Sequence, residues 1–268
     1  MTHRRLAALP AALAVLCLCA LFAPASAKPA LTKPVFAPGA AWDWQLSRPV
    51  DFSLRVPVLD TDPDLIDRRA IARLRRRGVY LICYVSVGTL EKGRADEGRF
   101  PRAVIGRTYA EWPDERFLDI RRLDVLLPLM RARFARCKRL GFDAIEPDNM
   151  DGHGNDTGFP LTRADTLRYV RALARMAHEM GLAIGQKNAP ELSAALAGTL
   201  DFAITESCFQ DRWCEKMAPW RRAGKPVLDA EYLDRPLNRK AACRAARRLG
   251  LSMIFKDRDL TKRRLSCR

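Results

Sequence analysis

The sequence contains little histidine, only three residues in 268. Two of them, His153 and His178, lie beyond the N-terminal segment, and neither has a zinc-binding spacing, which disfavours a metal-dependent hydrolase. No G-x-S-x-G motif is present, so a serine hydrolase of the α/β type has no support. No glycine fingerprint follows the first predicted strand, which disfavours a dinucleotide site or a phosphate-binding loop. We therefore expect neither a metal nor a cofactor.

Acidic residues are also in the minority, with 31 Asp and Glu against 47 Lys and Arg and a formal net charge of +16. Such a surplus can mark a nucleic-acid-binding protein. The basic residues, however, alternate with apolar residues in stretches such as "RRAIARLRRRG" and "RARFARCKRLG", a pattern typical of solvated outer helices. No nucleic-acid motif accompanies them. We expect no nucleic-acid partner, and binding of a polyanion through these helices stays an alternative.

Long apolar stretches are absent after residue 27. Residues 1–27 combine the basic "MTHRR", the apolar "LAALPAALAVLCLCALFA" and a small-residue end at Ala27, which together indicate a secretory signal peptide. Pro10 and Pro24 interrupt the apolar run, which argues against the alternative of a retained membrane anchor. We expect cleavage near Ala27, a secreted or periplasmic location and no stable membrane anchor.

The remaining chain has the length of one α/β barrel. Residues 28–40, "KPALTKPVFAPGA", are rich in Pro and Ala and are assigned to an N-terminal linker. Residues 41–268 are assigned to a single domain, which we expect to be monomeric.

Six cysteines follow the predicted signal, at positions 83, 137, 208, 214, 243 and 267. An even number in an exported chain favours disulfides over metal binding. Cys208 and Cys214 enclose a short loop and form the best candidate pair. The other pairings stay open, and a buried free thiol is an alternative for Cys83.

Eight apolar runs of strand length alternate with helical stretches, and several of these helices end in a Gly suited to a left-handed C-cap. The runs cover residues 41–46, 56–60, 79–86, 142–148, 182–186, 201–206, 226–232 and 251–255. Such alternation predicts a parallel sheet covered by helices, and eight units predict the α/β class and a single (β/α)₈ TIM barrel. An open doubly wound sheet is the alternative. The segment from Thr89 to Ile120 breaks the pattern and is expected to form a long loop over the top of the barrel.

Polar residues gather where the predicted strands end, which is where a barrel builds its active site. In "GFDAIEPDNMDG", strand periodicity places Glu146 and Asp148 on one face and Ile145 on the other. Carboxylates with nearby aromatic rings suit the cleavage of a sugar chain. Candidate catalytic and substrate-binding residues are Trp44, Gln45, Asp60, Tyr84, Glu146, Asp148, Asn149, Asp151, Lys187, Asn188, Glu206, Glu231 and Tyr232.

The chain resembles glycoside hydrolase family 114, the secreted endo-α-1,4-polygalactosaminidase group. The matching segments run in order across residues 41–232 and are "WDWQL", "ICYVSVGTLEKGR", "ERFLDIR", "GFDAIEPDNMDG", "TGFPLT", "GLAIGQKNAPEL", "DFAITESCF" and "GKPVLDAEY". This resemblance implies a (β/α)₈ barrel that cleaves an α-1,4-linked galactosamine-containing polysaccharide. It implies that Asp148 and Glu206 are the essential acids.

We accordingly expect an endo-acting, retaining glycoside hydrolase with Asp148 as nucleophile, Glu206 as acid and base, and an amino-sugar polymer as partner. A non-catalytic exported carbohydrate-binding barrel is the alternative of a different class. A deacetylated galactosamine polymer is cationic, so a strongly basic protein would not attract it at long range. Either the acidic rim dominates locally, or the substrate is acetylated or different.

Overall fold

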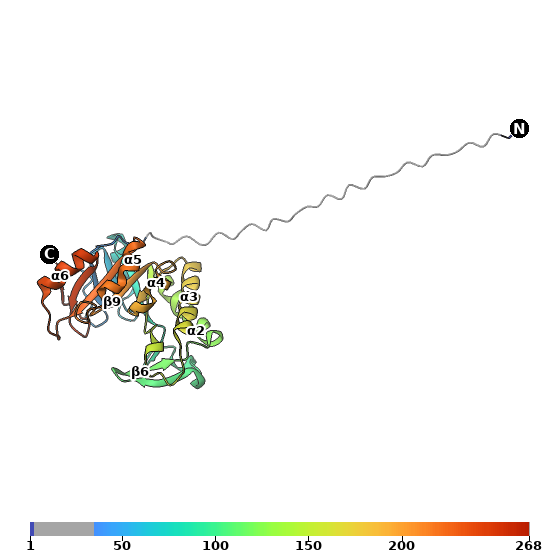
Figure 1. Cartoon of the computed structure of the whole chain (residues 1–268), viewed down its shortest axis with the longest axis horizontal. Coiled ribbons are helices and arrows are strands. Elements are labelled where there is room, and N and C mark those ends of the chain that lie inside the picture. The colour runs from blue at the N-terminus through green and yellow to red at the C-terminus, as the bar shows by residue number, and fades with distance from the viewer. Residues whose placement is uncertain (3–34, 268) are drawn as a thin grey trace.

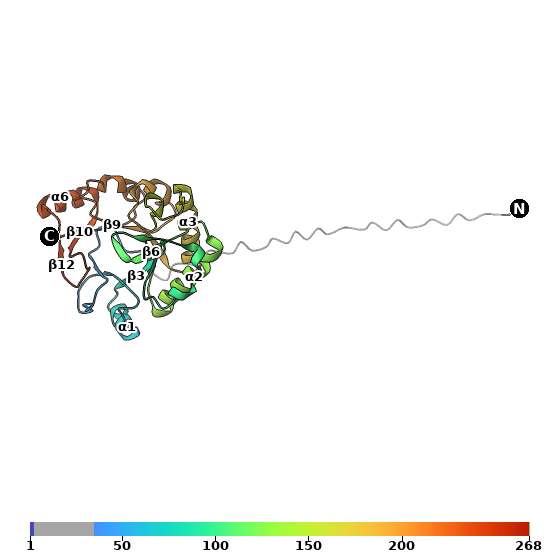
Figure 2. The ribbon, with the colours of Figure 1, turned by 90° about the horizontal axis from the view of Figure 1, so that it is seen from below.

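The computed structural model describes residues 1–2 and 35–267, so the predicted signal peptide and most of the predicted linker lie outside the described residues. Eight parallel strands pair in chain order and form a nearly closed barrel (Figures 1 and 2). They are β1 (Trp42–Gln45), β2 (Val58–Thr61), β3 (Tyr80–Ser86), β7 (Ala144–Asp148), β8 (Ala183–Lys187), β9 (Phe202–Glu206), β10 (Val227–Tyr232) and β11 (Ser252–Lys256), and β12 (Arg264–Ser266) adds antiparallel to β11. The predicted (β/α)₈ barrel is confirmed.

The ring of strands closes between β1 and β11 through side chains. The Trp42 indole Nε1 donates to the carbonyl oxygen of Ser252 at 2.7 Å. The Lys256 ammonium lies 3.0 Å from the Asp43 carboxylate, and both side chains are buried. Because residues at opposite ends of the chain meet in this way, the sheet is a barrel and not the alternative open sheet.

Helices surround the strands, as Figure 2 shows. They are α1 (Arg68–Arg76), α2 (Leu123–Leu140), α3 (Arg163–Glu179), α4 (Ser193–Leu196), α5 (Ala218–Arg222) and α6 (Arg239–Leu249), with short 3₁₀ turns η1 (Glu97–Arg99), η2 (Arg102–Val104), η3 (Gly152–Gly154), η4 (Pro190–Leu192) and η5 (Cys214–Met217). Thr162 and Asp165 form a capping box at the start of α3. Gly141 and Gly250 end α2 and α6 in the left-handed conformation, as the terminal glycines predict.

Two apolar layers follow from strand alternation. Outward residues such as Ile145 pack against the helices, and inward residues such as Ala144 fill the barrel. The inner layer includes Phe36, whose ring lies 5.3 Å from the Tyr80 ring and 5.5 Å from the Phe202 ring. Residues from 35 onward, within the range assigned to the linker, therefore contribute to the barrel core. No helix among the described residues has the length and apolar character needed to cross a membrane.

The segment from Thr89 to Ile120 differs from the expected loop. It forms a three-stranded antiparallel sheet in the order β4 (Thr89–Glu91), β6 (Trp112–Leu118), β5 (Ile105–Tyr109). Figure 1 shows this sheet at one end of the barrel, away from most of the helices. Most of β6 is exposed or half-buried. This strand therefore lacks the alternation of apolar and polar residues that predicts a strand from sequence.

Three disulfides join Cys83 to Cys137, Cys208 to Cys214 and Cys243 to Cys267. The predicted Cys208–Cys214 pair is confirmed, and the alternative of a free thiol at Cys83 is wrong. Cys83 lies on β3 and Cys137 on α2, so this bridge fastens a helix to the barrel wall.

We expect the Cys83–Cys137 and Cys208–Cys214 bridges to contribute unequally to stability, because they close loops of different length. The Cys83–Cys137 bridge spans 54 residues and the Cys208–Cys214 bridge spans 6. Replacing Cys83 and Cys137 by Ala should lower the free energy of unfolding by about 4 kcal/mol, against about 2 kcal/mol for Cys208 and Cys214, because the longer loop gains more entropy when opened. Guanidinium unfolding without reductant measures both values. An equal loss in the two double variants would contradict the expectation.

Candidate active site

A cavity of about 920 Å³ opens at the C-terminal ends of the barrel strands. The small antiparallel sheet contributes one wall through Tyr109, Glu115 and Trp112, and about half of the Trp112 surface is exposed. Sequence-predicted residues that line the cavity are Trp44, Tyr84, Asp148, Asn149, Asp151, Lys187, Asn188, Glu206 and Tyr232. Most of the predicted rim is thus brought together in one place.

Lys187, the last residue of β8, lies at the centre of this site. Its Nζ is 2.7 Å from Asp148, 3.0 Å from Glu146 and 3.1 Å from Glu206. The ammonium also lies 4.6 Å from the centre of the Trp44 ring, a cation–π arrangement. Burial favours the neutral amine, but the three carboxylates outweigh it and hold the pKa of Lys187 well above its ordinary value. One ammonium group therefore forms ion pairs with three carboxylates.

Asp148 ends β7 and faces the cavity. Its second carboxylate oxygen accepts a hydrogen bond of 3.0 Å from the Tyr84 hydroxyl. The next residue, Asn149, has a φ of 59°, a conformation that Asn tolerates better than most residues. The turn there passes so close to Gly88 that a Cβ on Gly88 would lie 1.6 Å from the Asn149 carbonyl oxygen. A glycine is therefore required beside the turn that presents Asp148.

Glu206 ends β9 and is held from three sides. Its carboxylate accepts hydrogen bonds from the Tyr232 hydroxyl and from Asn188 Nδ2 at 3.0 Å, and Asn188 Oδ1 accepts from the Glu206 amide at 2.9 Å. Burial would raise the pKa of Glu206, but Lys187, Tyr232 and Asn188 together lower it below its ordinary value. In the free protein this carboxyl group is therefore favoured in its ionised form.

Glu146 and Asp60 lie fully buried within the barrel, beside Lys187. Glu146 accepts a hydrogen bond of 3.1 Å from the Trp44 indole, and burial together with the charge of Asp148 raises its pKa to about 7. Burial, then the charge of Glu146, raises the pKa of Asp60 well above its ordinary value. Asp60 is thus favoured in its neutral form, in which its proton can be donated to Glu146.

Residues 23–268 match the glycoside-hydrolase family GH114. This chain belongs to family GH114. It is therefore a glycoside hydrolase.

Three relatives illustrate the range of similarity. Ega3 from Aspergillus fumigatus, crystallised in complex with galactosamine, is 31% identical, with 88% of this chain and 99% of that chain covered and a TM-score of 0.82. The glycoside hydrolase domain of PelA from Pseudomonas aeruginosa shares the fold at 16% identity, with 84% and 97% covered and a TM-score of 0.64. An uncharacterised protein of Deinococcus radiodurans is 26% identical, with 72% of this chain and 69% of that protein covered.

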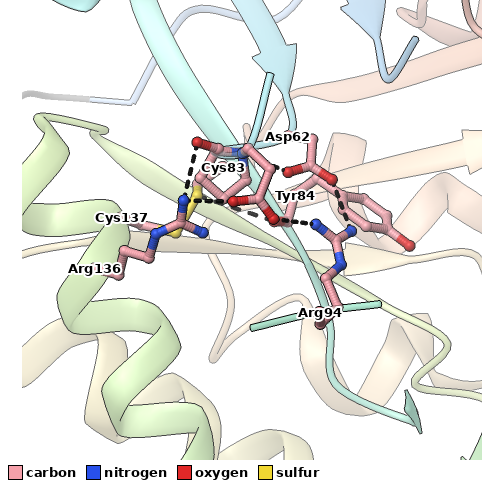
Figure 3. The surroundings of a disulfide bond; sticks show 8 residues. Asp62, Cys83, Tyr84, Arg94, Arg136 and Cys137 are labelled. Atoms are coloured by element: carbon pink, nitrogen blue, oxygen red, sulfur yellow. Dashed lines mark hydrogen bonds and ion pairs between the residues drawn. A yellow bond between two sulfur atoms is a disulfide. The ribbon is translucent and has the colours of Figure 1, made fainter. Parts of the chain in front are cut away.

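Arg94 is a residue of this GH114 site to which sequence reasoning gave no role. Its guanidinium pairs with Asp62 at 2.7 Å and with Asp64 at 2.8 Å, and it also pairs with Glu91. It lies 5.9 Å from the centre of the Tyr84 ring, which Figure 3 shows beside it. Arg94 lies within the quoted segment "ICYVSVGTLEKGR", but only the folded chain reveals which acids surround it.

The Arg94 cluster continues to the Cys83–Cys137 bridge. Arg136, on α2 next to Cys137, pairs with Asp64, and Figure 3 shows Arg136 beside the disulfide. A continuous set of contacts thus runs from the disulfide through Asp64 and Arg94 to Tyr84, which holds the carboxylate of Asp148. These contacts fix the side of the site that carries Asp148.

Four predicted substrate-binding residues do not line the cavity. Glu146 lies fully buried, 3.0 Å from Lys187 Nζ. Asp60 lies buried behind Glu146. Gln45 alternates with the inward Trp44, donates to the Asp43 carboxylate at 2.8 Å and accepts from a backbone amide. Glu231 accepts hydrogen bonds from the backbone amides of Phe209 and Gln210. Gln45 and Glu231 thus bind backbone amides of neighbouring loops instead of facing the cavity.

Glu231 holds the loop that follows Glu206. Beside it lies Asp229, whose pKa is raised by burial and by the charge of Glu231. These two acids also lie within 4.8 Å of the sulfur atoms of Cys208 and Cys214. The sulfurs are joined in a disulfide, so they offer no thiolate to a metal ion.

The buried acid Asp60 should make the stability of the enzyme depend on pH. The pKa of Asp60 is raised in the folded state, so its protonated form stabilises the fold. This contribution to the free energy of unfolding is complete below the pKa of the unfolded chain, and it is lost as pH rises toward the pKa of the folded state. Asp60→Asn imitates the protonated form at every pH. Relative to the parent, the variant should gain stability above pH 4, by up to about 1.4 kcal/mol per pH unit.

Chemical unfolding between pH 4 and pH 8 measures this difference. Asp114→Asn is the matched control, because the Asp114 side chain is 82% exposed and its replacement should leave the pH dependence unchanged. A constant offset between Asp60→Asn and the parent across this range would show that Asp60 is ionised in the folded enzyme.

Proposed function

We propose that this GH114 enzyme cleaves an α-1,4-linked galactosamine polymer at internal bonds with retention of configuration. Asp148 acts as the nucleophile, and Glu206 acts first as the acid and then as the base. The observation that carries the proposal is the pair of carboxylates that face one cavity and contact the same Lys187 ammonium. The similarity to Ega3, a protein crystallised with galactosamine, supports this class of substrate.

The separation of the two acids supports retention. Their oxygens lie 2.7 and 3.1 Å from the same nitrogen atom, so they can be no farther apart than the sum of these distances, about 6 Å. Retaining glycosidases have carboxyl groups about 5–5.5 Å apart, whereas inverting ones need about 6.5–9.5 Å to admit a water molecule. The short separation favours direct attack by a carboxylate on the sugar.

The reaction then has two balanced steps. Asp148 bonds to the anomeric carbon while Glu206 gives its proton to the glycosidic oxygen, and the carbon–oxygen bond breaks. Water next attacks the same carbon, Glu206 takes its proton, and the bond to Asp148 breaks. Lys187 stays protonated throughout, because its pKa is held far above neutrality, and it keeps Asp148 in place.

The charge of the cavity suits a cationic polymer although the whole protein is basic. Four basic residues line the cavity, namely Arg94, Lys187, Arg235 and Arg258, against nine acidic ones, namely Asp62, Glu91, Glu111, Glu115, Asp148, Asp151, Glu206, Asp211 and Asp259. A cleft lined mainly by one sign of charge concentrates ligands of the other sign. The local excess of acids therefore supports a cationic substrate despite the net charge of +16.

We also propose that the enzyme is exported as a monomer, with residues 1–27 removed near Ala27 and residues 28–40 leading into the barrel domain. The three disulfides support an oxidising compartment. The intact mass of the secreted protein tests the cleavage position.

Replacing either acid should abolish turnover without unfolding the enzyme. Asp148→Asn and Glu206→Gln should each lower kcat on α-1,4-galactosamine oligomers by about 10²–10⁴-fold, the range expected for loss of a positioned acid or base. Release of reducing ends measures the rate, and proton NMR of the first product reports its configuration. Asp259→Asn is the control, since Asp259 lines the cavity without contacting Lys187. Normal activity in either acid variant would refute the assignment.

The Tyr232 hydroxyl should set the pH range of activity. Glu206 must carry a proton to act as the acid, so kcat/KM should fall as pH rises through its pKa in the free enzyme. The bond from Tyr232 stabilises the ionised form and lowers that pKa. Tyr232→Phe should therefore move the alkaline limb of the profile upward, by about one pH unit.

The control for this measurement is Tyr109→Phe, because Tyr109 lines the same cavity without a hydrogen bond to Glu206. Its profile should coincide with that of the parent. A limb that stays in place or moves to lower pH in Tyr232→Phe would contradict the role of Tyr232.

A further inference from the structure

A second cavity, of about 470 Å³, adjoins the first. Asp151, Asn188 and Glu206 line both cavities, whereas Asp148 lines only the first. Glu206 therefore lies where the two cavities meet. A sugar attacked by Asp148 must occupy the first cavity, so the space beyond Glu206 faces the other side of the bond that is cut.

Trp213 forms part of the second cavity. It belongs to the loop closed by Cys208 and Cys214, and its backbone amide donates to the Cys208 carbonyl oxygen at 2.8 Å. The ring is half-buried against the core. The indole Nε1 donates no hydrogen bond to any residue in the described part of the chain. The loop thus presents a rigid aromatic group with a free donor, a combination well suited to binding a sugar ring.

The charges around the second cavity favour a cation. Within residues 35–267, no side chain donates a hydrogen bond or forms an ion pair to the Asp151 carboxylate. Burial and the charge of Asp148 raise the pKa of Asp151. The other acid of this wall, Glu191, contacts His153 at 3.0 Å. Asp151 is therefore the carboxylate left to meet an ammonium group.

We propose that the second cavity binds the galactosamine unit on the leaving-group side of the cleaved bond, with its ring against Trp213 and its ammonium group at Asp151. This inference rests on the proposed function and extends it, since it assigns a second binding site and its ligand. A polymer then lies across Glu206 with one unit held on each side of the bond that is cut.

The test compares substrates with and without a sugar in the second cavity. Trp213→Ala should lower kcat/KM on an α-1,4-galactosamine octamer by about tenfold, equivalent to about 1.4 kcal/mol. It should leave kcat/KM on α-galactosaminyl fluoride within about twofold of the parent, because fluoride places no sugar beyond Glu206. Trp213→Phe keeps an aromatic ring and should recover most of the activity on the octamer.

Mass spectrometry of octamer products in ¹⁸O-labelled water adds a second readout, because the label marks which fragment carries the new reducing end. Trp213→Ala should shift the positions of cleavage along the octamer. The matched control is Trp112→Ala, which changes the first cavity only. The ratio of kcat/KM on the fluoride to kcat/KM on the octamer should change less in Trp112→Ala than in Trp213→Ala.

Two outcomes overturn the inference while leaving the proposed function intact. One is an unchanged rate and product pattern on the octamer in Trp213→Ala. The other is an equal loss on the octamer and the fluoride, which would mean that Trp213 only supports Glu206. If the parent enzyme cleaves neither the octamer nor the fluoride, the proposed function itself fails, and the inference fails with it.

Discussion

The Lys187 ammonium, within 3.1 Å of three carboxylates, is the interaction on which the site depends. Glu146, Asp148 and Glu206 come from two strands on either side of Lys187 in the barrel, and without a cation between them their charges would repel in a poorly hydrated space. Removing one member of a buried ion pair commonly costs about 3–5 kcal/mol, because the remaining charge is left uncompensated. The ends of three adjacent strands are thus held together by one charge.

The same separation of charge organises the whole molecule. Arginines cover the outer faces of helices such as α1, where Arg73, Arg75 and Arg76 also lie near the negative end of the helix dipole. Acids collect at the opening of the barrel. Screening limits the reach of the outer charges to about 8–10 Å in physiological salt, so a ligand inside the cavity experiences mainly the local acids. A basic surface and an acidic cavity can therefore coexist in one chain.

Sequence periodicity predicts the eight barrel strands and their order, because each strand keeps an apolar face toward the helices. It also predicts that Asp148 and Glu206 lie near one another, since strand ends in a barrel converge, whereas their choice as the two essential acids comes from the family resemblance. It does not predict which way a polar residue at a strand end points. Gln45 and Glu231 accept hydrogen bonds from neighbouring backbone amides. Arg94 lies beside Tyr84 because a small sheet with exposed strands positions it there. Such contacts depend on tertiary packing, which local pattern does not encode.

The closing contact between Trp42 and Ser252 joins residues 210 positions apart. During synthesis, β1 is made first but has no β11 to meet until nearly the whole chain has been made. Until then the first strand has one neighbour, and the buried side chains Asp43 and Lys256 remain unpaired. The barrel therefore cannot close strand by strand as it emerges. Its final step is the meeting of the two ends of the chain, and a truncation before residue 252 leaves a sheet with an open edge where the ring should be.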